Sequence, residues 1–175
     1  YCFIQHPLDT EMFKPETSPS GGMAGSLREQ LQKEHNADLI FLSPTRHSLS
    51  ERFGAKGTEH LLWGFAQYLQ SVRDGNAPSA VLLLARWGED VPATHTLIEN
   101  LGIKDHVAWF PMLTKPQLAV LYRACDVVLD QFWEGCGSFG TVTAEGLASG
   151  KPVITYLDEE VHQWAIESGG LLSSP

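Results

Sequence analysis

Apolar residues occur in two alternating patterns from residue 38 onward. Short runs in which nearly every residue is apolar predict strands that are buried on both faces of a sheet. These runs are 38–42, 80–85, 106–110, 127–130, 153–156 and 171–172. Between them, apolar residues recur at intervals of three and four, which predicts amphipathic helices. The helices are expected at 58–72, 93–101, 115–125, 141–149 and 160–167, with a short one at 27–34 before the first strand.

Two of these helices carry end signals. Thr114 and Gln117 have capping-box spacing, and Pro116 falls in the first turn that follows. Gly102 lies just past the last apolar residue of the helix at 93–101. Trp63 and Trp109 are expected in the core.

A strand and a helix in strict alternation predict a doubly wound, Rossmann-like α/β fold, with about six parallel strands and helices on both faces. By analogy with other six-stranded sheets of this class, we expect the strand order 3-2-1-4-5-6. Strands one and four are then neighbours, and ligands bind in the crevice beyond their carboxyl ends.

A glycine-rich loop follows the fourth strand and leads into a helix. Gly135, Gly137 and Gly140 allow a ligand to approach the backbone, and the helix start attracts anions, so the loop suggests a phosphate site. The same spacing, G-x-G-x-x-G, matches the dinucleotide fingerprint. A third interpretation is a loop that only turns the chain.

The loop after the first strand is basic and belongs to the other half of the expected crevice. Arg46 and Lys56 are favoured as phosphate contacts. Arg52, beside an acid, is expected to be a solvated charge. His47 could make a loop hydrogen bond or a ligand contact. Glu145, about one turn into the next helix, could accept hydrogen bonds from ligand hydroxyls or complement the helix dipole.

Bulk properties narrow the classes of function. The 175 residues suit one domain, and a formal net charge of −9 argues against nucleic-acid binding. The three cysteines are far apart, and no spacing suggests a metal site. No apolar run approaches a membrane-spanning length and no signal peptide opens the chain, so a cytoplasmic location is expected.

Four segments resemble elements of one family. The segment 139–154, FGTVTAEGLASGKPVI, follows the pattern F-G-x-x-x-x-E-A-M-A-x-G-x-P-V-I. Arg46 with Lys56-Gly57 is similar to G-R-x(n)-K-G, with a longer insert. Residues 101–107 match L-G-L-x-D-x-V, and 7–15 resemble a hinge, N-G-V-D-T-x-x-F-x-P. The chain thus resembles the C-terminal, nucleotide-sugar-binding domain of family 4 retaining glycosyltransferases, which have the two-Rossmann (GT-B) architecture.

The resemblance implies roles for the matching positions. Arg46 and Lys56 would neutralise the donor diphosphate, and Glu145 would bind the ribose. The base would lie near Met112 and Leu113. The phosphates or the sugar would be held by the loop residues Gly137, Ser138, Phe139, Gly140 and Thr141. Gly137 replaces a family glutamate that contacts the sugar, so sugar recognition would use a neighbour such as Glu134, a backbone group, or a different arrangement.

The resemblance also implies an arrangement of domains and a reaction. Residues 1–22 would be an interdomain hinge and flexible loop, and 23–175 the donor domain. The donor would be a UDP-sugar or GDP-sugar, and its sugar would be transferred without a metal or cofactor. The acceptor would be a glycan or a lipid-linked molecule, held by an N-terminal domain outside this chain. Any peripheral membrane association would belong to that missing part.

Two alternatives stay open. An NAD-binding oxidoreductase module would use the glycine fingerprint together with an acid among Asp158, Glu159 and Glu160. A non-catalytic nucleotide-binding domain would bind the nucleotide without transferring the sugar.

Overall fold

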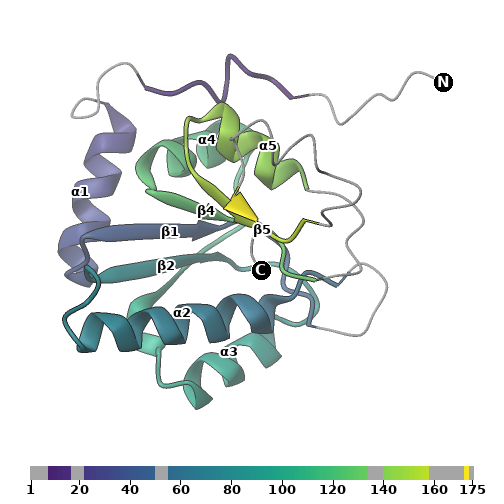
Figure 1. Cartoon of the computed structure of the whole chain (residues 1–175). Helices are drawn as coiled ribbons and strands as arrows, with labels where there is room; N and C mark the ends of the chain where they lie inside the picture. The colour runs from purple at the N-terminus through teal and green to yellow at the C-terminus, as the bar shows by residue number, and fades with distance from the viewer. Residues whose placement is uncertain (1–7, 17–21, 50–54, 134–139, 158–171, 174–175) are drawn as a thin grey trace.

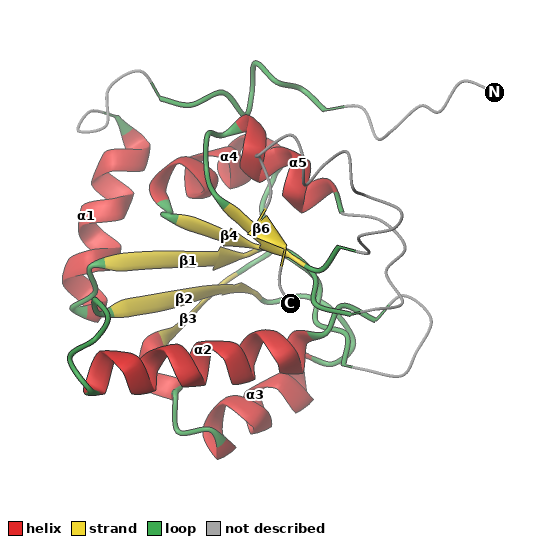
Figure 2. Ribbon diagram, in the orientation of Figure 1, coloured by secondary structure: helices red, strands yellow, loops and turns green. Residues whose placement is uncertain are grey.

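The computed structural model describes residues 8–16, 22–49, 55–133, 140–157 and 172–173. These residues form one parallel six-stranded sheet in the order β3-β2-β1-β4-β5-β6 (Figures 1 and 2). The strands are β1 (Leu39–Ser43), β2 (Ala80–Ala85), β3 (Val107–Phe110), β4 (Val127–Leu129), β5 (Val153–Thr155) and β6 (Leu172–Ser173). The helices are α1 (Met23–His35), α2 (Thr58–Arg73), α3 (Val91–Asn100), α4 (Lys115–Ala124) and α5 (Thr141–Ala148), with a short 3-10 helix η1 at Lys104–His106.

The expected strand order is confirmed. In β1, Phe41 is in register with Leu82 of β2 on one side and with Val127 of β4 on the other. The chain therefore reverses its direction of winding between β1 and β4, and the loops that follow these two strands meet at one edge of the sheet. All six residues of β2 are buried, as its unbroken apolar sequence predicts for a central strand.

Helices cover both faces of the sheet, and each face has its own apolar core (Figure 1). On one face, α2 and α3 pack on β1 and β2 through residues such as Leu62, Phe65 and Ile98. On the other face, α1, α4 and α5 pack around Tyr122, with Phe13 of the segment 8–16 against its ring. The capping box of α4 is present: the Gln117 side chain accepts hydrogen bonds from the Thr114 backbone N–H at 3.0 Å and from its hydroxyl.

Most helices and strands begin and end within a few residues of the bounds predicted from the sequence. The helix predicted at 27–34 begins earlier, at Met23, and the helix predicted at 160–167 lies outside the described residues. The prediction for Trp63 is wrong, because its side chain is 47% exposed. It lies between the apolar positions of α2 and therefore faces solvent, where it contacts His60 edge to face. Trp109 is partly buried against the core beneath α2 and α3.

The described parts of the chain contain no helix that is both long and apolar enough to span a membrane.

Candidate functional site

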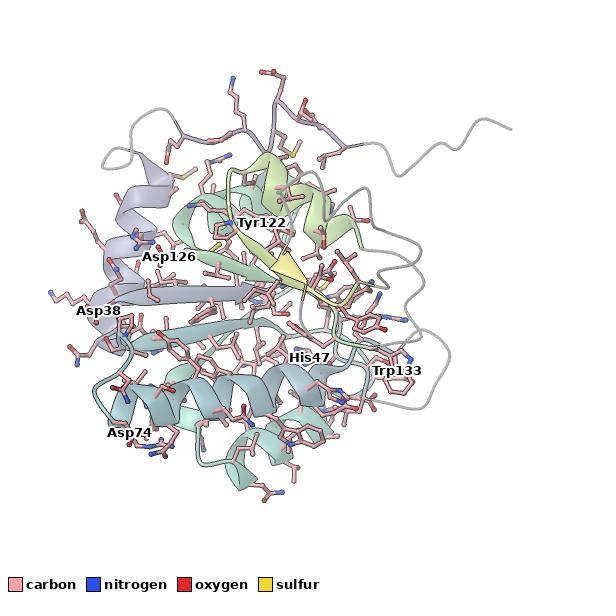
Figure 3. The ribbon with its side chains drawn as sticks, in the orientation of Figure 1. Asp38, His47, Asp74, Tyr122, Asp126 and Trp133 are labelled. Atoms are coloured by element: carbon pink, nitrogen blue, oxygen red, sulfur yellow. The ribbon has the colours of Figure 1, made fainter. Side chains whose placement is uncertain are left out.

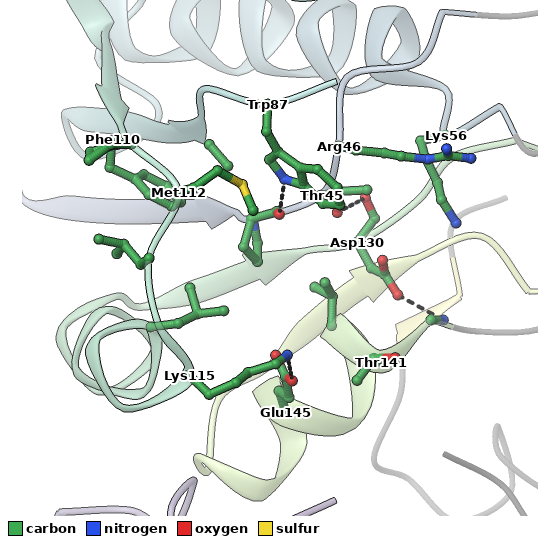
Figure 4. Close-up of a pocket in the computed structure, with 17 residues that line it drawn as sticks. Thr45, Arg46, Lys56, Trp87, Phe110, Met112, Lys115, Asp130, Thr141 and Glu145 are labelled. Carbon is green, nitrogen blue, oxygen red and sulfur yellow. Dashed lines mark hydrogen bonds and ion pairs between the residues drawn. The ribbon is translucent and has the colours of Figure 1, made fainter. Parts of the chain in front are cut away.

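A cavity of about 430 Å³ opens where the carboxyl ends of the central strands meet (Figure 4). The loops after β1, β2, β3 and β4 contribute to it, and the first turns of α4 and α5 close it. It is lined by Pro44, Thr45, Arg46, Lys56, Ala85, Trp87, Phe110, Pro111, Met112, Leu113, Lys115, Leu118, Asp130, Gly140, Thr141, Val142 and Glu145. The cavity therefore lies at the switch point that the strand order creates.

Lys56 is held at the rim by the segment that follows β4. Its Nζ donates to Oε1 of the buried Gln131 at 2.7 Å, and its carbonyl accepts the N–H of Phe132 at 2.9 Å. The next residue, Gly57, has φ +65°, and a Cβ there would lie 2.6 Å from the carbonyl carbon of Phe132. Only glycine allows this close approach, which presses the loop after β1 against the loop after β4.

Further contacts join the loops around the cavity. The Thr45 hydroxyl donates to the carbonyl of Asp130 at 3.2 Å, which connects the loops after β1 and β4. The indole N–H of Trp87 donates to the carbonyl of Pro44 at 3.0 Å, which connects the loops after β2 and β1. Arg46 leaves the same loop and reaches the rim beside Lys56 (Figure 4).

His47 is buried beneath the cavity and makes the loop hydrogen bond that was one of its two expected roles (Figure 3). Its Nε2 lies 2.8 Å from the carbonyl of Ala85, so Nε2 carries the proton and donates. Burial lowers the pKa of His47 from 6.5 to about 4, so the ring is neutral at physiological pH. His47 thus supports the loop from below and is absent from the residues that line the cavity.

Asp130 follows β4, and its side chain caps the start of α5. The carboxylate Oδ2 accepts the N–H of Gly140 at 3.0 Å and the hydroxyl of Thr143 at 2.6 Å. A Cβ at Gly140 would lie 2.9 Å from Oδ2, so a larger residue there would displace the carboxylate. Burial raises the pKa of the Asp130 carboxyl, whereas the hydrogen bonds from Thr143 and Gly140 and the charge of Lys56 oppose that rise.

Glu145 is 2% exposed, and both of its carboxylate oxygens have donors. Lys115 forms an ion pair with Oε1, and the Tyr122 hydroxyl donates to Oε2 at 3.0 Å. A lysine in the first turn of α4 is unfavourable for the dipole of that helix, and Glu145 compensates it. The two partners hold a buried carboxylate at the cavity wall in one orientation.

The charged residues of the lining are Arg46, Lys56 and Lys115 with Asp130 and Glu145, which leaves one net positive charge. In a chain of net charge −9 this is a local concentration of cations, suited to an anionic group with polar substituents. Within the described ranges, no three His, Cys, Asp or Glu side chains gather in a way that could hold a metal ion.

Seven of the residues predicted for the site line this single cavity. They are Arg46, Lys56, Met112, Leu113, Gly140, Thr141 and Glu145. The predicted residues Gly137, Ser138 and Phe139, together with Arg52, lie outside the described part of the chain.

Sequence reasoning missed Lys115 and Asp130, which line the cavity, and Gln131, which holds Lys56 at its rim. Two signals pointed to them. Asp130 and Gln131 directly follow a buried strand at its carboxyl end, where ligand-binding residues gather in such sheets. Lys115 places a positive charge at a helix start, where a structural residue would more often be acidic.

Three comparisons place the chain among known proteins. In an alignment 158 positions long, the chain is 41% identical to the D-inositol 3-phosphate glycosyltransferase of Mycobacteroides abscessus, and the match covers 72% of this chain and 34% of that protein. The chain therefore spans about a third of the length of this curated relative. The Anabaena protein HepE, solved with UDP-glucose, has a TM-score of 0.62 at 24% identity, over 85% of this chain and 36% of HepE.

A C-terminal domain of a group 1 glycosyl transferase from Francisella tularensis has a TM-score of 0.63 at 18% identity, over 97% of this chain and 80% of that domain. These two likenesses show that the fold is shared. The family model for glycosyl transferases group 1 matches residues 47–169, which include Lys56, the glycine loop and α5 but begin just after Arg46. The chain belongs to the glycosyl transferases group 1 family.

Proposed function

We propose that this chain is the donor-binding domain of a retaining, metal-independent glycosyltransferase of family 4, and that its donor is a nucleoside-diphosphate sugar of the UDP or GDP type. One observation carries the proposal. Arg46 and Lys56 come from the loop after β1, and Glu145 comes from α5, almost a hundred positions later. All three line one cavity, together with the first residues of α5.

The donor would lie along the cavity from the loop after β3 to the start of α5. The diphosphate would contact Arg46 and Lys56, which are the cations at the rim near Asp130 (Figure 4). The ribose hydroxyls would reach Glu145, and the base would pack against Met112 and Leu113. Met112 is 65% exposed, so an apolar side chain is available there to cover a base.

The chemistry follows from the charge that develops during transfer. When the bond between the sugar and the diphosphate breaks, the leaving nucleoside diphosphate gains negative charge. Arg46 and Lys56 would stabilise that charge from fixed positions, because Lys56 is already held by Gln131. Removal of one such preorganised donor typically costs on the order of 3 kcal/mol in activation free energy.

The acceptor is assigned to the rest of the polypeptide. We infer that residues 1–22 form the hinge to an N-terminal domain, which would hold a glycan or lipid-linked acceptor and close over the donor. Phe13 is consistent with a hinge anchored on the donor domain, because its ring is buried against Tyr122. The HepE complex makes UDP-glucose the first donor to test.

Calorimetry with UDP, GDP and ADP tests the donor site and gives the base preference. Arg46→Ala and Lys56→Ala should each weaken the binding of the preferred nucleotide by about tenfold or more, because each removes a charge-assisted contact. Lys104→Ala is the matched control, since this lysine is exposed on η1 beside Glu99 and far from the lining residues. Tight binding of NADH with no binding of UDP or GDP would instead support the dinucleotide alternative.

Activity requires the full-length enzyme. There, both substitutions should slow sugar transfer far more than they lower the melting temperature, since both residues lie at the rim and outside the two apolar cores. Transfer rates close to wild type would refute the assignment. A full-length enzyme that binds the donor and transfers no sugar would support the non-catalytic alternative.

A further inference from the structure

Asp130 and Lys115 are the two charged lining residues without a proposed donor contact, and Lys115 is already paired with Glu145. The Asp130 side chain is 3% exposed and lines the cavity at the end where Arg46 and Lys56 lie (Figure 4). A buried carboxylate is costly to desolvate, so its position at this wall calls for groups that compensate it.

The two oxygens of this carboxylate are used differently. Oδ2 accepts both hydrogen bonds from α5, from the Gly140 N–H at 3.0 Å and the Thr143 hydroxyl at 2.6 Å. Besides the Gly140 N–H, the Thr143 hydroxyl and the Thr143 backbone N–H, no described residue donates a hydrogen bond to this carboxylate. Asp130 lines the cavity, and each carboxylate oxygen has more than one lone pair, so Oδ1 can accept a further hydrogen bond from a ligand there.

The chemistry of Oδ1 selects what it can bind. An ionised carboxylate oxygen accepts hydrogen bonds and donates none, and its charge repels a phosphate oxygen. The diphosphate would sit against Arg46 and Lys56 at the same end of the cavity, so Oδ1 would face the part of the donor attached to that diphosphate. In a nucleotide sugar the diphosphate carries the ribose on one side and the sugar on the other. With the ribose at Glu145, the part that faces Oδ1 would be the sugar, whose hydroxyl groups are hydrogen-bond donors.

We propose that Asp130 is a sugar-recognition residue, in which Oδ2 fixes the start of α5 and Oδ1 accepts a hydrogen bond from one hydroxyl of the donor sugar. The proposal rests on the donor site described above and extends it from the nucleotide to the sugar. It makes the cavity selective for donors that present a hydroxyl at this wall. A nucleoside diphosphate without a sugar gains nothing from Asp130 and is repelled by its charge.

Asp130→Asn separates this role from a purely structural one. The amide oxygen of asparagine can still accept the hydrogen bonds of Gly140 and Thr143, while an NH₂ group replaces Oδ1 and the negative charge is lost. The variant should therefore bind UDP as well as wild type or more tightly. It should bind UDP-glucose about tenfold or more weakly, because a hydrogen bond to a charged acceptor is removed.

Asp126→Asn is the matched control. Asp126 precedes β4 at the opposite end of the same strand, where it pairs with Arg28 at 2.8 Å (Figure 3). Its substitution should leave the ratio of the two dissociation constants unchanged. The measurement is calorimetry of UDP and UDP-glucose with the same protein preparation, with GDP and GDP-mannose as the second pair.

The outcomes are distinct. The proposal is supported if the ratio of the UDP-glucose dissociation constant to the UDP dissociation constant rises above the wild-type ratio in Asp130→Asn and stays at the wild-type ratio in Asp126→Asn. Equal weakening of both ligands would show that Asp130 only holds α5, and no weakening of either would also overturn the proposal. If the wild-type protein bound none of the four nucleotides, the donor site itself would be refuted, and the sugar role with it.

Deoxy donors give a test that requires no variant. UDP-glucose analogues that each lack one hydroxyl are titrated into the wild-type protein, and one of them should bind about tenfold more weakly than UDP-glucose. That analogue should lose nothing further when Asp130 is changed to asparagine. If every deoxy analogue bound as tightly as UDP-glucose, no hydroxyl would depend on Asp130 and the proposal would fail.

Discussion

Tyr122→Phe measures how much the structure depends on holding Glu145 in place. Tyr122 is fully buried, and its hydroxyl donates to Glu145 Oε2 at 3.0 Å. Burial raises the pKa of Tyr122 well above its ordinary value, so the hydroxyl remains a donor throughout the physiological range. Phenylalanine keeps the ring and its edge-to-face contact with Phe13 at 5.6 Å, so only the hydroxyl is removed.

The magnitude follows from the partners of the carboxylate. Glu145 is 2% exposed and, among the described residues, would keep only Lys115 as a donor. A hydrogen bond to a charged buried group contributes about 2 kcal/mol, so the free energy of unfolding should fall by about that amount. For a chain of this length the melting temperature should fall by about 4–8 °C. Urea unfolding and thermal melts followed by circular dichroism give both quantities.

Tyr68→Phe is the control for this experiment. The Tyr68 hydroxyl donates to the carbonyl of Pro78 at 2.8 Å, in an exposed position with a neutral acceptor. Its loss should cost only about 0.5 kcal/mol. If Tyr122→Phe were no more destabilising than Tyr68→Phe, the Glu145 carboxylate would not depend on its tyrosine partner, and the description of the site would be wrong on that point.

Two further predictions concern the loop that carries Arg46 and Lys56. Gly57→Ala should destabilise the protein by about 3 kcal/mol and weaken nucleotide binding, because it combines positive-φ strain with the clash against Phe132. Gly75→Ala, at φ +73° with open space around it, should cost only about 1 kcal/mol in the same urea titrations, and equal losses would contradict the close approach. His47 has a folded pKa of about 4 against 6.5 when unfolded, so the unfolded chain binds more protons between these values, and about 3 kcal/mol of stability should be lost as pH falls through that window. Urea titrations between about pH 4 and pH 7 should show this loss, which His47→Gln should abolish and the exposed His60→Gln should leave intact.

Several polar groups at the site hold one another in place through hydrogen bonds. Gln131 positions the Lys56 ammonium, and Lys56 in turn receives the Phe132 N–H at its carbonyl. Asp130 accepts the hydrogen bond of the Gly140 N–H, which from the sequence was expected to be available to a phosphate. The described structure thus pairs its own acid with this amide, which shifts the expected phosphate contacts toward Arg46, Lys56 and the rest of the helix start.

The sequence by itself determined the elements, because their signals are local. The unbroken apolar run of β2 predicted its bounds to the residue, and the spacing of Thr114 and Gln117 predicted the cap of α4. Regular alternation of strands and helices then restricts the sheet to a few orders, since parallel strands need right-handed crossovers. Arg46, Lys56 and Glu145 could be nominated because the expected order brings the ends of their elements to one edge.

The tertiary structure alone decided which side chains share the cavity and in what state. Whether His47 faces a ligand or the Ala85 carbonyl depends on how the loops after β1 and β2 fold over one another. The pairing of Lys115 with Glu145 joins residues thirty positions apart, on two helices whose mutual placement no periodicity encodes. The role of Asp130 is also set by packing. Its carboxylate caps α5 and lines the cavity only because α5 packs against β4. Periodicity reports which side of an element is apolar, whereas hydrogen bonds and ion pairs between elements depend on ångström-level distances that only packing sets.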